Sequence, residues 1–176
     1  VLFRSTVTDQ DATPASAGHE PRWLDQDQQR TWRSFLLGTT LLLDRLDEDL
    51  RREHGLSAVE YEILVRLSEA GGTLRMAQLA AALAHSRSRV THTVKRMENA
   101  GLVVREESPE DGRGVDCRLT DSGLDMLRTA APDHVETVRR SLVDLVDPED
   151  LQALGRVMNA VCDQLICAHP ERELRH

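Results

Sequence analysis

Six basic side chains lie close together in the middle of the chain, in a pattern that suits binding to a polyanion. Between Arg75 and Arg105 the sequence has a single acidic residue, Glu98, so this stretch carries a formal charge of +5. The whole chain carries −8, which leaves −13 for the remaining residues. A basic island on an acidic protein is the charge distribution expected of a nucleic-acid-binding surface. The six bases are Arg75, Arg87, Arg89, Lys95, Arg96 and Arg105.

The stretch from Ser86 to Ala100 has helical periodicity and would present several of these bases on one surface. In a helical projection Val90, Val94 and Met97 share a narrow apolar face, and polar side chains occupy the rest. Such a helix suits the major groove of DNA, and its first backbone N–H groups suit a phosphate. The alternative is a solvated amphipathic helix, which does not explain the excess of bases. The candidate DNA-binding residues here are Ser86, Arg87, Ser88, Arg89, Thr91, His92, Lys95 and Arg96.

Caps and periodicity predict the helices that position this one. A long amphipathic stretch ends at Gly55, and Ser57 and Glu60 then have the spacing of a capping box that begins the next helix. That helix ends at Gly71-Gly72, and the two helices that follow it have the spacing of a helix-turn-helix. The predicted helices are residues 22–54, 57–70, 75–83 and 86–100.

After Gly101 the periodicity changes from helical to alternating. Leu102–Glu106 and Val115–Leu119 are predicted to be two short strands, joined by a turn at Ser108–Gly112. This order of helices followed by a hairpin is that of a winged helix-turn-helix. The predicted fold class is therefore mainly α with a small β-hairpin wing.

Two more helical regions follow the wing. Thr120 is expected to cap a fifth helix, which Pro132 should bend or break before it resumes to about Leu145. Asp147-Pro148 has the pattern of a cap followed by a first-turn proline, so a last helix is expected to run to about Cys167.

Several segments resemble the MarR family of bacterial regulators over about Trp23–Leu165. They are LSAVEYEILVRL, MAQLAAAL, SRSRVTHTVKRMENAGLVVR, PEDGRG and RLTDSG. The most specific feature is Asp111-x-Arg113 followed by Leu119-Thr120. The sequence departs from the family where Ala84 replaces the usual turn glycine, and three glutamates make the wing acidic: Glu106, Glu107 and Glu110.

The resemblance implies a homodimer joined by its first and last two helices, in which Arg113 enters the minor groove and Asp111 orients nearby basic side chains. The corresponding organisation is a single domain over residues 21–168. It comprises dimerisation helices at about 22–54 and 121–167, a DNA-binding lobe at about 57–120, and tails at 1–20 and 169–176. Residues 1–20 lack periodicity and are expected to be disordered.

Relatives in this family often respond to small aromatic or phenolic effectors, and this chain has residues that suit such a pocket. They are Trp23, Trp32, Arg33, Phe35 and Tyr61. For each of them, packing in the core or at the dimer interface is the alternative role.

Other classes of function find less support. No phosphate-binding glycine loop or nucleophile motif is present, so an enzyme is not expected. The histidines are scattered, and His54 is explained as a helix C-cap, so neither a metal site nor a cofactor is predicted. No apolar run is long enough for a membrane span, and the three cysteines lack a disulfide or zinc spacing, which favours the cytoplasm.

The predicted function is therefore a sequence-specific DNA-binding transcriptional regulator. We expect a ligand-responsive repressor that binds a near-palindromic operator on double-stranded DNA as a dimer. Two alternatives stay open: a redox sensor that uses Cys162 or Cys167, and a winged-helix protein–protein module that does not bind DNA.

Overall fold

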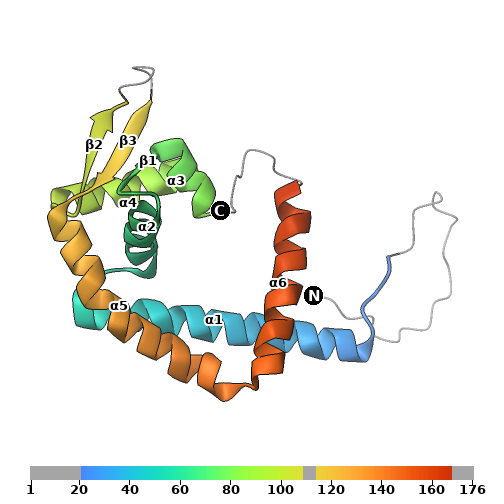
Figure 1. The fold of residues 1–176 in the computed structure, drawn as a ribbon. Coiled ribbons are helices and arrows are strands. Elements are labelled where there is room, and N and C mark those ends of the chain that lie inside the picture. Colours follow the sequence, from blue (N-terminus) through green and yellow to red (C-terminus); the bar gives the residue numbers. More distant parts are fainter. Residues whose placement is uncertain (1–20, 109–113, 168–176) are drawn as a thin grey trace, which may run out of the picture. The chain divides into compact units, whose positions relative to one another are not determined.

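The computed structural model describes residues 21–108 and 114–167, and it confirms a mainly helical fold with a small sheet (Figure 1). The chain divides into two compact units, Val1–Leu37 and Gly38–His176. The predicted domain bounds stay a prediction, and the predicted tails lie outside the described residues. The elements are α1 (Gln26–His54), α2 (Ala58–Glu69), β1 (Thr73–Arg75), α3 (Met76–Ala82), α4 (Arg87–Asn99), β2 (Val103–Glu107), β3 (Val115–Leu119), α5 (Asp121–Ser141), a 3₁₀ turn (Val143–Leu145) and α6 (Pro148–Cys167).

Side-chain caps begin three of these helices; those at Ser57 and Thr120 were predicted, and the one at Ser86 was not. Ser57 and Glu60 form the full capping box of α2, with the Ser57 N–H donating to the Glu60 carboxylate at 2.8 Å. The Ser86 hydroxyl accepts from Arg89 N–H at the start of α4, and the Thr120 hydroxyl accepts from Gly123 N–H at the start of α5. Each cap satisfies a backbone donor that the helix itself leaves unpaired.

The core of the DNA-binding lobe lies among α2, α3 and α4. It is aliphatic, as expected of a chain with few aromatic residues. The side chains that are fully shielded from solvent are Ile63, Leu64, Leu67, Leu79, Val90, Val94, Met97, Val103 and Cys117. The predicted apolar face of α4 is thus the face that this helix buries.

The sheet has three antiparallel strands in the order β1-β3-β2, where the sequence predicted only a two-stranded hairpin. The additional strand, β1, pairs Leu74 with Cys117, and its last residue is Arg75, which was assigned to the third helix. Three residues are too few to show an alternating pattern, so β1 could be recognised only through its pairing with β3. The predicted wing strands themselves are confirmed.

Pro132 does not interrupt α5, which is continuous from Asp121 to Ser141 (Figure 1). The expectation that the helix bends or breaks there and resumes to Leu145 was wrong about the break and about the end. Proline removes one backbone donor and crowds the preceding turn. The continuous helix shows that the packing of α5 outweighs this cost.

The junction between the wing and α5 is unusually close. The Thr120 hydroxyl lies 2.7 Å from the Gly101 carbonyl oxygen and 2.9 Å from that of Leu102, while it also accepts from Gly123 N–H. Gly123 is buried, and a Cβ atom added to it would lie 2.1 Å from the Leu102 carbonyl oxygen. Only glycine therefore fits at position 123.

We expect Gly123→Ala to lower the free energy of unfolding by about 1–3 kcal/mol or more, because the new methyl group forces α5 away from the Leu102 carbonyl. Urea denaturation of the two proteins measures the difference. Gly155→Ala is the matched control, since a Cβ at this helical position meets nothing within 4 Å and should be neutral or stabilising. An unchanged midpoint for Gly123→Ala would contradict the close approach.

Candidate nucleic-acid interface

The polar face of α4 is open to solvent along its whole length. All eight residues predicted to bind DNA on this helix and at its cap are exposed, while Val90, Val94 and Met97 are buried beneath them. Within the part of the chain that the structure describes, no ion pair involves Arg87, Arg89 or Lys95. These three cations and the Ser86 cap lie on a surface that suits the phosphates and base edges of a groove.

Arg96 differs from these residues because its guanidinium is held by α2. Its Nε donates to Glu60 Oε1 at 2.8 Å, and Glu60 also forms the capping box with Ser57. Burial raises the pKa of Glu60, but the hydrogen bonds from Ser57 and Arg96 outweigh this effect and lower it. The side chain of Arg96 stays 53% exposed, so it can orient α4 and still reach the surface.

A second ion pair joins α4 to the wing. Arg105 in β2 donates from Nε and Nη2 to Glu98 Oε2 at 3.0 and 2.7 Å, and its backbone N–H donates to Glu98 Oε1. These hydrogen bonds from Arg105 lower the pKa of Glu98, although burial opposes them. The single acid of the basic stretch is therefore a connection between two elements.

The turn between α3 and α4 contains an alanine in the left-handed region. Ala84 has φ 52°, a conformation that favours glycine, and it is the one non-glycine residue with positive φ in the described chain. Backbone hydrogen bonds from Ala84 N–H to Ala81 and from His85 N–H to Ala80 hold the turn. The substitution noticed in the sequence thus leaves α4 attached through a strained turn.

Arg75 Nη2 lies 3.4 Å from the hydroxyl of Ser108, the residue that follows β2, and Arg118 pairs with Glu106 across the strands at 2.6 Å. The Arg118 contact occupies one of the acids that make the wing negative. Asp111 and Arg113 lie outside the described residues, so their roles stay predictions.

Four of the five residues predicted to form an effector pocket line hollows, and these hollows are different. Trp23, Trp32 and Arg33 line one of about 250 Å³, and Trp32 stacks on Phe35 with ring centroids 5.8 Å apart. Tyr61 instead lines a cavity of about 410 Å³ with residues that were not among those predicted for an effector pocket. They include Leu43, Leu83, Ala84, His85, His134 and Cys162.

The cysteines differ in their exposure. Cys117 is buried, and this burial raises the pKa of its thiol to about 12, which keeps it protonated and unreactive at neutral pH. Cys162 is exposed on α6. Among the described residues, no helix has both the length and the apolar character needed to cross a membrane.

We expect Glu60→Gln to lower the free energy of unfolding by about 1–2 kcal/mol at neutral pH, because Arg96 loses a charged acceptor. The pKa of Glu60 is lower in the folded chain, so its contribution is present above its unfolded pKa and disappears as the pH falls through the folded value. The two proteins should therefore begin to converge in stability as the pH falls below the ordinary glutamate pKa of about 4.3.

Urea denaturation at pH 7 and at a pH well below the ordinary glutamate pKa measures this convergence. Glu62→Gln is the control, since Glu62 lies on the same helix but pairs with Arg66 of α2, at 2.7 Å, and not with a residue of α4. An equal deficit for Glu60→Gln at both pH values would contradict the role of the charge.

Comparison with known proteins identifies the fold. A family model described as MarR family matches residues 54–114. The HTH-type transcriptional regulator PecS of Dickeya dadantii is 33% identical over 123 residues, which cover 67% of this chain and 74% of that protein.

Two solved structures from Streptomyces coelicolor are also similar. Sco3205, a MarR family transcriptional regulator in complex with DNA, is 43% identical to this chain with a TM-score of 0.81. The match covers 84% of this chain and 93% of the Sco3205 chain. AbsC, a MarR family transcriptional regulator, is 44% identical with a TM-score of 0.79, and the match covers 82% of this chain and 98% of the AbsC chain. The chain therefore belongs to the MarR family, and it is a DNA-binding transcriptional regulator.

Proposed function

We propose that the protein is a cytoplasmic repressor that binds a near-palindromic operator as a homodimer and releases it when a small ligand binds. The observation that carries this proposal is the continuous exposed face of α4, which combines cations with short polar side chains. In each half-site α4 would lie in the major groove, with the two half-sites about one helical turn apart. The similarity to Sco3205, solved in complex with DNA, supports this mode.

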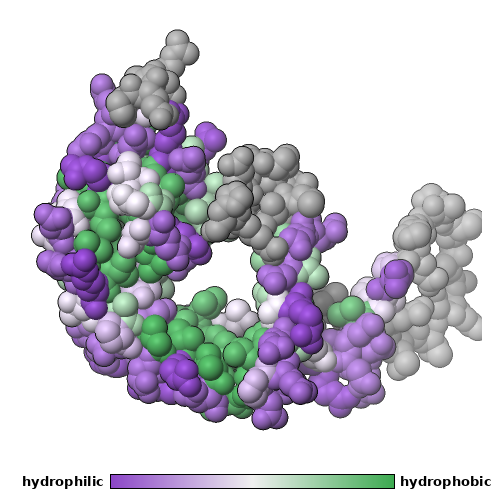
Figure 2. Space-filling view, viewed as in Figure 1, coloured by the Kyte–Doolittle hydropathy of each residue, from purple (hydrophilic) through white to green (hydrophobic). Residues whose placement is uncertain are grey.

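Exposed apolar side chains support the dimer. Trp32 and Leu36 on α1 are 45% and 46% exposed, and Val157 and Val161 on α6 are 59% and 44% exposed. Figure 2 shows hydrophobic surface along α1. Apolar stripes of this kind are a liability on a monomer and are expected where a second copy packs. The exposed cations Arg87, Arg89 and Lys95 on α4 argue against the alternative in which the winged helix serves only to bind other proteins.

The exposed face of α4 predicts a division between residues that read bases and residues that contact phosphates. His92→Ala should cost about 1–3 kcal/mol on the best operator and relax the preference at one base pair. Lys95→Ala should weaken binding to all duplexes alike, because a phosphate contact carries no sequence information. Selection of duplexes from random sequence, followed by affinity measurement, separates the two effects.

Arg128→Ala is the control for lost positive charge, since Arg128 lies on α5 and pairs with Asp125. A change of base preference in Lys95→Ala but not in His92→Ala would reverse the assignment. Failure of the parent protein to bind any duplex would favour the protein–protein module.

For the ligand site we propose the cavity lined by Tyr61. Its walls come from α1, α2, α5 and α6 on one side and from Leu83, Ala84 and His85 in the turn before α4 on the other. Its volume of about 410 Å³ suits a small molecule, and its lining combines aliphatic carbon with a phenol and two imidazoles. Burial and the nearby Arg89 charge lower the pKa of His85, so its ring stays neutral at pH 7 and suits a phenolic or aromatic ligand.

A bulky side chain in this cavity should abolish release by ligand. We expect Leu43→Trp to bind operator normally but to lose the response to a panel of phenols and aromatic acids, measured by fluorescence anisotropy of labelled operator. Leu41→Trp is the matched control, because Leu41 is equally exposed on α1 but does not line the cavity. An unaltered response to the ligands in Leu43→Trp would contradict the assignment of the ligand site to this cavity.

A further inference from the structure

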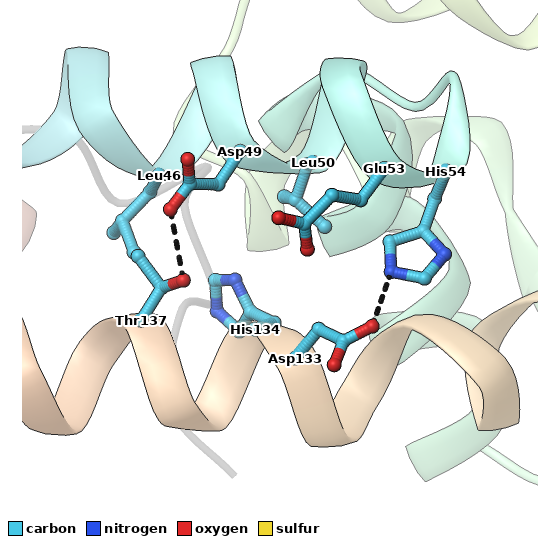
Figure 3. A pocket seen from close by; sticks show the side chains of 8 residues that line it. All are labelled: Leu46, Asp49, Leu50, Glu53, His54, Asp133, His134 and Thr137. Carbon is cyan, nitrogen blue, oxygen red and sulfur yellow. Dashed lines mark hydrogen bonds and ion pairs between the residues drawn. The ribbon is translucent and has the colours of Figure 1, made fainter.

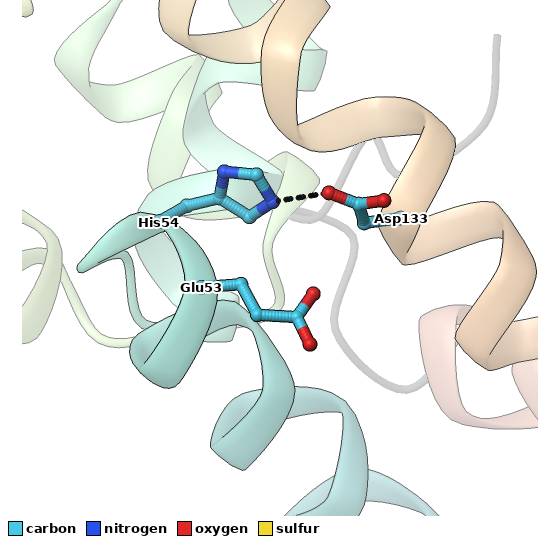
Figure 4. Close-up of side chains that lie close together, drawn as sticks. All are labelled: Glu53, His54 and Asp133. Carbon is cyan, nitrogen blue, oxygen red and sulfur yellow. Dashed lines mark hydrogen bonds and ion pairs between the residues drawn. The ribbon is translucent and has the colours of Figure 1, made fainter.

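The carboxyl-terminal end of α1 meets the middle of α5 in a group of side chains that suits a metal ion. His54 Nε2 lies 3.0 Å from Asp133 Oδ2, and Glu53 projects toward the same point (Figure 4). One potential ligand atom of each residue lies within 4.8 Å of the other two. His54 was interpreted as a helix cap from its position at the end of α1, and its partner Asp133 lies 79 residues away in the chain.

A second histidine lines the same narrow cleft between α1 and α5. His134 follows Asp133 and faces α1 across the cleft (Figure 3). Its Nδ1 atom is shielded from solvent and has no hydrogen-bond partner among the residues that the structure describes. Leaving a buried polar atom without a hydrogen-bond partner costs free energy of folding. This observation on His134 is independent of the contact between His54 and Asp133. The cleft therefore holds a nitrogen donor beyond the three clustered residues.

The donor set limits the ion to one chemical class. One imidazole and two carboxylates suit a divalent first-row transition metal, and three protein ligands leave a position open for water. The neighbouring cation is Arg52, whose Nη2 lies 2.7 Å from Glu53 Oε1 and also contacts Asp49. Arg52 offsets one of the two carboxylate charges and leaves a net negative site for a divalent ion.

We propose that Glu53, His54 and Asp133 form a binding site for a divalent transition-metal ion such as Zn²⁺, which cross-links the end of α1 to α5. His54 is the last residue of α1, and Gly55–Ser57 connect it to α2. An ion at this point fixes the end of α1 against α5 where the chain enters the DNA-binding lobe. His134 lines both this cleft and the Tyr61 cavity, but none of the three proposed metal ligands lines that cavity, so the metal site does not depend on the proposed ligand response.

The test is a zinc titration of the full chain after metal is removed, with a chromophoric chelator as competitor. We expect one Zn²⁺ per chain, and at least a tenfold loss of affinity in His54→Gln and in Asp133→Asn. Glu136→Gln is the matched control, because it removes one exposed acid from the same helix and should bind zinc as the parent does. Two separate ligand variants protect the test against one that misfolds, which circular dichroism detects.

Two further measurements identify the atoms that ligate the metal ion and test whether the ion stabilises the fold. The Co²⁺-loaded protein should show an oxygen- and nitrogen-ligated spectrum without a thiolate charge-transfer band, which separates this site from the cysteines. Zn²⁺ should raise the midpoint of thermal unfolding in the parent and in Glu136→Gln but not in His54→Gln. Parent-like zinc affinity in both ligand variants, or a thiolate band, would overturn the proposal.

Discussion

The carboxylate of Glu60 is shared between two helices, and the orientation of α4 depends on this sharing. One oxygen completes the capping box that begins α2, and the other accepts a hydrogen bond from Arg96 in α4. Apolar packing by Val90 and Val94 buries one face of α4 but is non-directional. The ion pair with Arg96 adds a directional contact to the orientation that the buried apolar face of α4 sets.

Two other contacts extend this order to the rest of the lobe. Arg105 ties the wing to α4 through Glu98, and Thr120 with Gly123 ties the end of the wing to α5. Both act through short polar contacts at element ends, where the backbone leaves donors and acceptors unpaired. The wing, α4 and the start of α5 are consequently joined to one another as well as to a common core. The strained turn at Ala84 lies at the other end of α4 and is held by backbone hydrogen bonds to Ala80 and Ala81.

The features that could be predicted from the sequence are those encoded by near neighbours in the chain. The capping box of α2, the buried stripe of α4 and the wing strands all follow from spacing of a few residues, and the structure confirms them. The features that were missed depend on residues far apart. β1 is a strand only because β3 pairs with it, and α5 continues through Pro132 because of tertiary packing. The neighbours of Arg96 and His54 lie on other helices.

The ion pairs that order the lobe also affect how binding should depend on salt. Arg96 and Arg105 belong to the basic stretch, but their charges are offset inside the protein by Glu60 and Glu98. The cations left to displace counterions from a duplex are chiefly Arg87, Arg89 and Lys95. Two protomers would then neutralise about six phosphates, and the logarithm of the affinity should fall with the logarithm of salt concentration with a slope of about −5. Formal charge alone would suggest a much steeper dependence.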